Sequence, residues 1–182
     1  MSKDFITGVG GFVASHLVDY LLEKGEEVIG TYRWNEDLSN INKTKPKIKM
    51  IPMDLNDLLS CIKAIEETKP DYIYHLAAQS YVSDSYIYPE ETIRTNTLGT
   101  LNLLEAIKIV MEKNSDFDPV IHVCSTSEVY GLVGKEDIPI KETTRFNPSN
   151  PYAVSKVAAD MWGLLYFTNY KMKVIRTRFF TH

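Results

Sequence analysis

The sequence predicts an α/β fold in which a doubly wound parallel sheet carries helices on both faces. Short apolar runs alternate with helical patterns at fairly even intervals, which is typical of strand–helix units in a parallel sheet. A glycine-rich turn joins the first strand to the first helix. The chain has 182 residues, of which 44% are hydrophobic and 24% charged, a size suited to one domain or to one domain plus part of a second.

In the first half of the chain, a strand at residues 4–7 leads into a helix at 11–24, which Gly25 ends. Strands are predicted at 28–32 and 48–53, each from a short apolar run. An amphipathic helix follows at 58–67, closed by Lys69 and Pro70, and the next strand is expected at 72–77. The first helix has one buried face because its apolar residues recur at helical spacing: Val13, Leu17, Val18, Leu21 and Leu22.

In the second half, a long helix is predicted from Pro89 through Val110, and the carboxylates of Glu90 and Glu91 suit the positive end of its dipole. A strand follows at 120–125. The segment 131–150 is rich in glycine, proline and charge and is expected to be a loop. A second long helix at 151–170 and a last strand at 174–179 complete the pattern.

Composition narrows the class of protein. The net charge is −4 and the basic residues are scattered, so no nucleic-acid partner is expected. No segment approaches the roughly 20 apolar residues that span a bilayer, and no signal-peptide pattern opens the chain, so we expect a soluble, cytoplasmic protein without membrane contact. Cys61, Cys124 and His75 lack ligand spacing, so we expect reduced core cysteines, a core or loop histidine and no metal site.

The turn at residues 7–14 reads TGVGGFVA and lies where the first strand meets its helix. Gly8 permits a tight turn, Gly11 lets the backbone approach a pyrophosphate, and the small Ala14 allows close helix–strand packing. An ordinary tight turn is the alternative, but the strand before and the helix after favour the dinucleotide-binding Rossmann arrangement. The predicted cofactor-binding residues of this turn are Gly8, Gly10, Gly11, Phe12 and Val13.

The end of the second strand bears on which dinucleotide binds. NAD enzymes usually place an acid there to accept hydrogen bonds from the ribose, yet no acid occurs before Glu36. Arg33 suits a 2′-phosphate, so NADP is the expected cofactor, although Arg33 as a solvated surface charge is the alternative. After the third strand, Asp54 and Leu55 are expected beside the adenine, unless Asp54 is only a helix cap.

Small side chains follow the fourth strand. Leu76, Ala77 and Ala78 are expected beside the cofactor because they leave room for it. Ser80 and Asn96 are expected to steady the neighbouring backbone.

A tyrosine and a lysine lie four residues apart on the last long helix. Tyr152 and Lys156 therefore share one helix face. A nearby lysine lowers the pKa of a phenol from about 10, which makes tyrosine usable as a base near neutral pH. Such a pair arises often by chance, but here it follows STSEVYG at the end of a strand, where open α/β sheets bind their ligands.

Six segments in order resemble the extended short-chain dehydrogenase/reductase (NAD-dependent epimerase/dehydratase) family: TGxxGFxxxxL, the DL after the third strand, HLAAQS, TNTLGTLNLLEA, STSEVYG and PYAVSK. The resemblance covers essentially the whole chain. Within this family, STSEVYG followed by KETT and NPSNPYAVSK is most similar to the GDP-mannose 4,6-dehydratases. The resemblance implies Thr126, Tyr152 and Lys156 as the core catalytic set, with Glu128 added in dehydratases, and permanently bound NADP.

The implied lyase reaction converts GDP-mannose to GDP-4-keto-6-deoxymannose. Tyr152 takes the proton of the sugar's 4-hydroxyl as hydride leaves carbon 4 for NADP, with Thr126 and Lys156 holding the reacting groups. Glu128 then removes the proton on carbon 5, water leaves from carbon 6, and hydride returns there. A structural carboxylate is the alternative interpretation of Glu128. Ser127 stands where dehydratases acting on dTDP-glucose typically have Asp, which favours GDP-mannose.

Two other functions stay open: an NADPH-dependent reductase of a GDP-4-keto-6-deoxy sugar, and a non-catalytic NADP-binding module. The chain ends directly after a predicted strand. We therefore expect residues 1–182 to be the NADP-binding domain of a longer two-domain enzyme whose C-terminal substrate domain is mostly absent. The resemblance also implies that the two long helices pack against a partner subunit in a homodimer or homotetramer.

Overall fold

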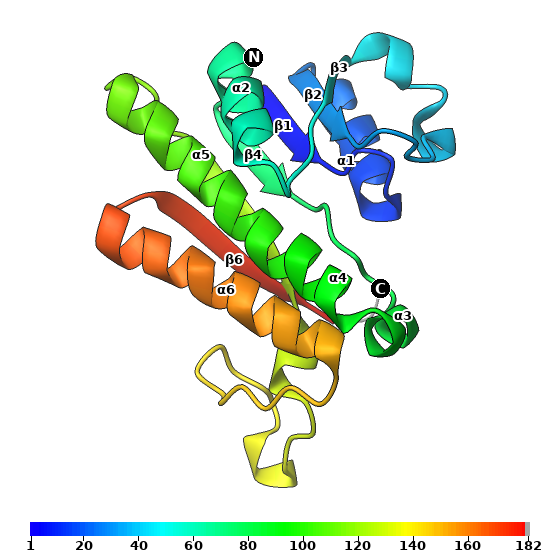
Figure 1. Cartoon of the computed structure of the whole chain (residues 1–182), viewed down its shortest axis with the longest axis vertical. Coiled ribbons are helices and arrows are strands. Elements are labelled where there is room, and N and C mark those ends of the chain that lie inside the picture. The colour runs from blue at the N-terminus through cyan, green and yellow to red at the C-terminus, as the bar shows by residue number, and fades with distance from the viewer. Residues whose placement is uncertain (181–182) are drawn as a thin grey trace.

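A computed structural model of the chain describes residues 1–180 and contains a six-stranded sheet (Figure 1). The strand order is β3-β2-β1-β4-β5-β6, and every neighbouring pair is parallel. The chain winds outward from β1 in one direction and then in the other, which confirms the predicted doubly wound sheet. The strands are β1 (Lys3–Thr7), β2 (Glu27–Tyr32), β3 (Lys49–Pro52), β4 (Tyr72–His75), β5 (Val120–Thr126) and β6 (Lys173–Phe179).

Helices cover both faces of the sheet. α1 (Phe12–Glu23) lies on one face, while α2 (Leu58–Thr68), α5 (Gly99–Lys113) and α6 (Pro151–Tyr170) lie side by side on the other (Figure 1). The remaining elements are short: the α-helices α3 (Val82–Ile87) and α4 (Pro89–Ile93), and the 3₁₀ turns η1 (Ser39–Ile41), η2 (Lys45–Lys47), η4 (Ser127–Tyr130) and η5 (Lys135–Asp137). No helix within residues 1–180 has the length and apolar character needed to cross a membrane.

Alternation along the strands builds two cores, because successive side chains of a strand point to opposite faces. In β1, Phe5 belongs to the core beneath α2, α5 and α6, together with Ile73 and Ile121 of the neighbouring strands. The next residue, Ile6, packs on the opposite face with Val18 of α1. The sheet is thereby held between two apolar layers, and its carboxyl edge is fixed in place.

The fourth strand is shorter than predicted. It ends at His75, whereas the apolar pattern predicts a strand to Ala77. The backbone N–H groups of Leu76 and Ala77 donate to the side-chain oxygen of Thr7, at 3.1 and 3.0 Å, and do not continue the ladder. These residues consequently leave the sheet and lie over the turn that follows β1.

The helix predicted from Pro89 to Val110 is interrupted. Its central segment, η3 (Arg94–Leu98), is a π-helical turn between α4 and α5. Two side chains of this turn bind neighbouring segments: Asn96 contacts the backbone of Gln79, and Thr97 donates to the carbonyl oxygen of Ser155 at 3.1 Å. Apolar periodicity predicts the helix but not this local widening, which is frequent at functional sites.

Candidate active site

A cleft of about 520 Å³ lies at the carboxyl ends of the strands. It is the position at which open α/β sheets bind ligands. The turn after β1, the ends of β2, β3 and β5, the segment after β4 and the start of α6 all contribute to its lining. The predicted site residues that line it are Gly8, Gly11, Phe12, Val13, Arg33, Asp54, Leu55, Leu76, Ala77, Ala78, Thr126, Glu128, Tyr152 and Lys156.

The glycine-rich turn has the conformation that its sequence predicts. Gly8 has a φ of +66°, and a Cβ there would lie 2.8 Å from the Cα of Ala77, so only glycine fits. Gly11 precedes α1, and within residues 1–180 no side chain caps this helix. The N–H groups of its first turn therefore face the cleft as free donors, which suits the anionic pyrophosphate of a dinucleotide.

Gly10 is the one predicted cofactor residue that lies away from the cleft lining. A Cβ at Gly10 would lie 2.6 Å from the carbonyl oxygen of Asp37. The Gly10 carbonyl oxygen accepts a hydrogen bond from the Asn40 side chain at 2.9 Å. Glycine is needed here because the segment after β2 packs against the turn.

The part of the cleft at the ends of β2 and β3 carries both signs of charge. Arg33 and Glu36 line it together, and the backbone N–H of Arg33 donates to Glu36 Oε2 at 2.8 Å. In the sequence Glu36 lies beyond the strand end, but this backbone bond brings its carboxylate back to the cleft. Asp54 also lines the cleft and accepts from the N–H of Asn56 at 2.9 Å. The cap of α2 itself is Asp57, whereas Asp54 caps only the short turn that precedes this helix.

Two buried polar side chains fix the segment after β4. His75 is buried between the hydroxyls of Thr7 and Thr100, at 2.9 Å from each, which agrees with the core position expected for it. Burial lowers the pKa of His75 to about 3, so the ring is neutral at neutral pH. Asn96 accepts from the Gln79 N–H at 2.8 Å and donates to the Gln79 carbonyl at 3.0 Å. The expected role of Asn96 in steadying this backbone is therefore confirmed.

Tyr152 and Lys156 reach the cleft from the first turns of α6. The Lys156 ammonium is buried and donates to the Cys124 carbonyl oxygen at 2.6 Å, and burial lowers its pKa. Burial also raises the pKa of Tyr152, although a hydrogen bond with Thr126 partly opposes this shift. The sequence predicts instead that Lys156 lowers the pKa of Tyr152. In this structure that prediction is wrong, because the ammonium binds a carbonyl and desolvation dominates the phenol.

Glu128 lies in the 3₁₀ turn after β5, which Thr126 caps. The Thr126 side-chain oxygen accepts from the Glu128 N–H at 3.3 Å. The Glu128 carboxylate is exposed, lines the cleft and accepts from the side-chain amide of Asn150 at 2.9 Å. This contact ties the carboxylate to the start of α6, which also carries Tyr152.

The GDP-mannose 4,6 dehydratase family model matches residues 5–182 of the chain. The chain belongs to this family. It is 38% identical to the GDP-mannose 4,6-dehydratase of Yersinia enterocolitica over 192 residues, covering 100% of the chain and 50% of that relative. The human GDP-mannose 4,6 dehydratase is 36% identical over 188 residues, covering 97% of the chain and 49% of that relative. The chain thus spans about half the length of the curated relatives it matches.

Solved structures agree with this assignment to the epimerase/dehydratase family. A UDP-glucose 4-epimerase from Thermus thermophilus, in complex with NAD, superposes with a TM-score of 0.83 and 30% identity. The alignment covers 97% of the chain and 54% of that structure. The Rossmann-like architecture of residues 1–180 is therefore the architecture of this family.

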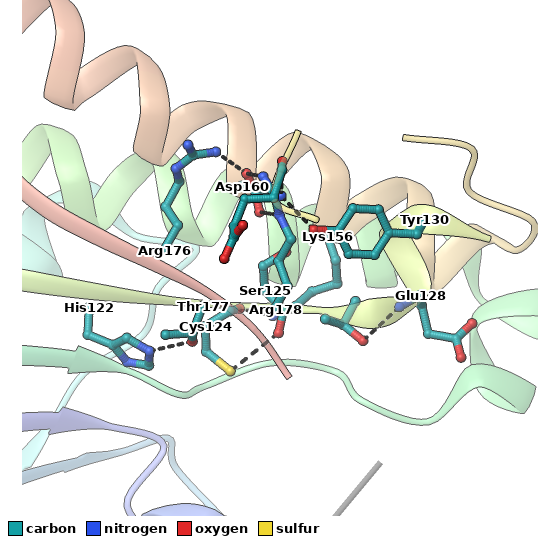
Figure 2. Close-up of polar contacts among 12 residues, drawn as sticks. His122, Cys124, Ser125, Glu128, Tyr130, Lys156, Asp160, Arg176, Thr177 and Arg178 are labelled. Carbon is teal, nitrogen blue, oxygen red and sulfur yellow. Dashed lines mark hydrogen bonds and ion pairs between the residues drawn. The ribbon is translucent and has the colours of Figure 1, made fainter. Parts of the chain in front are cut away.

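One buried ionic cluster behind the cleft was not predicted. Asp160, fully buried one turn beyond Lys156 on α6, contacts Arg176 and Arg178 of β6 (Figure 2). Burial alone would raise the pKa of Asp160, but the two arginines outweigh it and lower that pKa. Arg178 Nη1 also donates to the hydroxyl of Tyr130 at 2.8 Å, and Asp160 raises the pKa of Arg178. The cluster joins α6, β6 and the turn that contains Glu128.

Cys124 is a second residue whose surroundings were not predicted. The expected core cysteine is half-buried and lines the cleft, and its carbonyl oxygen is the acceptor for Lys156. Its position at the end of β5 was the available signal, because strand ends in this fold border the ligand site.

Proposed function

We propose that this chain is the NADP-binding domain, residues 1–182, of a nucleotide-sugar 4,6-dehydratase that converts GDP-mannose to GDP-4-keto-6-deoxymannose. The observation that carries the proposal is the presence of Glu128 in the same cleft as Thr126, Tyr152 and Lys156. A reductase or epimerase needs the last three, whereas removal of water also needs a carboxylate beside the reacting sugar. The family of the chain supports the same function.

The cleft fits a dinucleotide. Gly8 allows the turn to pack directly against Ala77, which a Cβ would clash with. Within residues 1–180, the first turn of α1 has no side-chain cap and offers donors to phosphate. The Thermus relative named above binds NAD. We infer NADP for this chain because the Arg33 guanidinium borders the adenosine end and can form a forked bond to a 2′-phosphate. When bound, the nicotinamide supplies reversible hydride acceptance.

Thr126, Glu128, Tyr152 and Lys156 have different roles in the proposed proton transfers. We assign Tyr152 as the group that removes the proton of the sugar's 4-hydroxyl, with Thr126 hydrogen-bonded to that oxygen. Because burial raises the pKa of Tyr152, this role requires the Lys156 ammonium to turn from the Cys124 carbonyl toward the phenol. Glu128 removes the proton on carbon 5 and delivers it to the hydroxyl of carbon 6, which leaves as water.

The test uses the full-length parent enzyme, purified without added cofactor and incubated with GDP-mannose. We expect a product lighter by one water without added NADPH, because the overall reaction is redox-neutral and consumes no reductant. Glu128→Gln should reduce water loss to a small residual rate while NADP stays bound, which separates chemistry from cofactor binding. NADPH consumption with a GDP-4-keto-6-deoxy sugar, and no water loss from GDP-mannose, would show a reductase instead.

Cofactor choice has its own test. Arg33→Ala should weaken NADP binding by roughly tenfold, as expected for loss of one charge-assisted contact, and leave NAD binding unchanged. Isothermal titration of both dinucleotides measures this, with Arg145→Ala on the exposed 131–150 segment as the control. Equal losses for NAD and NADP would contradict the assignment of the 2′-phosphate to Arg33.

We also propose that the long helices assemble the enzyme into a homodimer or homotetramer. Apolar side chains remain exposed on the outer surface of α6, among them Val154, Met161 and Phe167. Met161→Glu should lower the sedimentation coefficient of the full-length enzyme. An unchanged coefficient would exclude this surface as the subunit contact.

A further inference from the structure

We propose that Asn150 is a positioning residue for the Glu128 carboxylate, an inference that rests on the dehydratase function proposed above. Asn150 immediately precedes α6. Its Nδ2 donates to Glu128 Oε2 at 2.9 Å, and its Oδ1 accepts from the N–H of Ala153 at 2.8 Å. One side-chain amide thus ties the carboxylate to the first turn of the helix that carries Tyr152.

Helix capping alone does not require asparagine. Asp, Asn and Ser stabilise a helix start about equally, because each supplies an oxygen to the first-turn N–H groups. Only an amide also presents N–H donors to a second partner. Aspartate in place of Asn150 would set two carboxylates against each other, and serine has no second arm that reaches Glu128. The choice of asparagine is therefore explained by the contact with Glu128.

The bridge matters because Glu128 is exposed on the cleft wall. Its backbone is fixed by Thr126, at 3.3 Å from the N–H to the threonine oxygen, but a glutamate side chain keeps considerable rotamer freedom at an exposed site. The Asn150 bond restricts that freedom from the other side. The charge of Glu128 contributes to the raised pKa of Tyr152, which shows that the carboxylate and the phenol are close enough to interact.

The Asn150 bridge also fixes the relative positions of the two side chains that act in successive steps, Tyr152 and Glu128. In the proposed reaction Tyr152 acts at carbon 4 and Glu128 at carbon 5 of the same sugar ring, so both side chains must reach neighbouring atoms of one bound substrate. Asn150 joins the two segments that carry them, the 3₁₀ turn after β5 and the start of α6. Misplacement by about 1 Å costs on the order of 100-fold in rate.

The experiment compares Asn150→Ser and Asn150→Asp in the full-length enzyme. Both variants keep a helix cap, and both lose the donor to Glu128. We expect kcat for water loss from GDP-mannose to fall roughly 10- to 100-fold with an unchanged KM, because only the proton transfer on carbon 5 is misaligned. Thermal unfolding temperatures should stay within about 2 °C of wild type, since the cap is retained.

A double-mutant cycle separates positioning from any general effect on structure. In a Glu128→Gln background, Asn150→Ser should cause no further loss of the residual turnover, because the carboxylate that Asn150 positions is already absent. Wild-type kcat in both single variants, or the same fold loss in the Glu128→Gln background, would overturn the role of Asn150 alone. If the wild type released no water from GDP-mannose, the dehydratase function and this role would fall together.

Discussion

The two helices that border the cleft begin in opposite ways. α1 starts at Gly11 without a side-chain cap from any residue in 1–180, so its first-turn N–H groups are directed to the cleft. α6 starts at Asn150, whose side chain caps the helix and binds Glu128. The difference separates two tasks. The helix start that we propose binds a ligand keeps its donors free, whereas the helix start that we propose positions catalytic side chains uses its donors within the protein.

The largest expected effect is the loss of stability when Asp160, which holds α6 to β6, is replaced. It tests whether α6 is anchored more firmly than α1. Asp160→Asn should lower the free energy of unfolding by about 3–5 kcal/mol, because it leaves two arginines without their buried counter-charge. Urea denaturation measures this. Asp19→Asn on the exposed face of α1 is the matched control and should change stability by less than about 0.5 kcal/mol. If both variants lowered the free energy of unfolding by only a small amount, the Asp160 ion pairs would not anchor α6.

Acid should act through the same carboxylate. Because the folded-state pKa of Asp160 is lowered, its ion pairs stabilise the fold above the unfolded pKa of about 3.9. That contribution is lost as the pH falls through the folded-state value. Stability measured between pH 6 and pH 2 should fall less steeply in Asp160→Asn than in wild type.

A smaller effect is expected at the start of α1. Gly8→Ala should weaken dinucleotide binding roughly tenfold to hundredfold, since an L-residue at φ +66° is strained by about 1–2 kcal/mol and its Cβ would displace Ala77. Gly25→Ala is the control, because φ there is +79° with open space around the added Cβ. It should lower stability by a similar strain energy and leave binding intact. Equal binding in both variants would contradict the role of the turn.

The smallest effect should come from giving α1 the kind of cap that α6 has. Gly11 has a φ of −68°, which serine tolerates, although its Cβ would lie 3.2 Å from the Gly8 carbonyl oxygen. Gly11→Ser should change stability by only a few tenths of a kcal/mol. The same hydroxyl would compete with phosphate for the helix N–H groups, so dinucleotide affinity should fall several-fold in a fluorescence titration. Tighter dinucleotide binding by Gly11→Ser would show that the start of α1 does not need free N–H donors.

The fold was predictable because apolar periodicity and the turn residues report local structure directly. The cleft followed because strand ends in this topology meet at one edge, and all the predicted site residues except Gly10 line it. The contacts of Gly10 and Glu36 depend on the path of the segment after β2. Hydrophobic patterning does not predict that path. The pKa of Tyr152 could not be inferred either, because helical spacing reveals a neighbour but neither its burial nor the direction of the Lys156 side chain.

The Asp160 cluster marks a second limit. Its arginines follow Asp160 by 16 and 18 residues, on a strand that pairs with β5. A single sequence gives the charges but not the pairing, since an aspartate on a helix is ordinarily solvated. The available signal was an acid within an otherwise apolar stretch of α6, followed by two arginines on the same face of β6.

The hydroxyl of Thr7 accepts two backbone N–H groups, from Leu76 and Ala77, so its own hydrogen is left for the Nδ1 atom of His75. A neutral imidazole that accepts at Nδ1 must carry its hydrogen on Nε2, which then donates to Thr100. The Thr100 hydroxyl in turn donates to the Asn96 carbonyl oxygen at 2.6 Å. In this series of hydrogen bonds each group therefore donates to the next, from Thr7 at the end of β1 to Asn96 in the π-helical turn. His75 is fixed as a single tautomer.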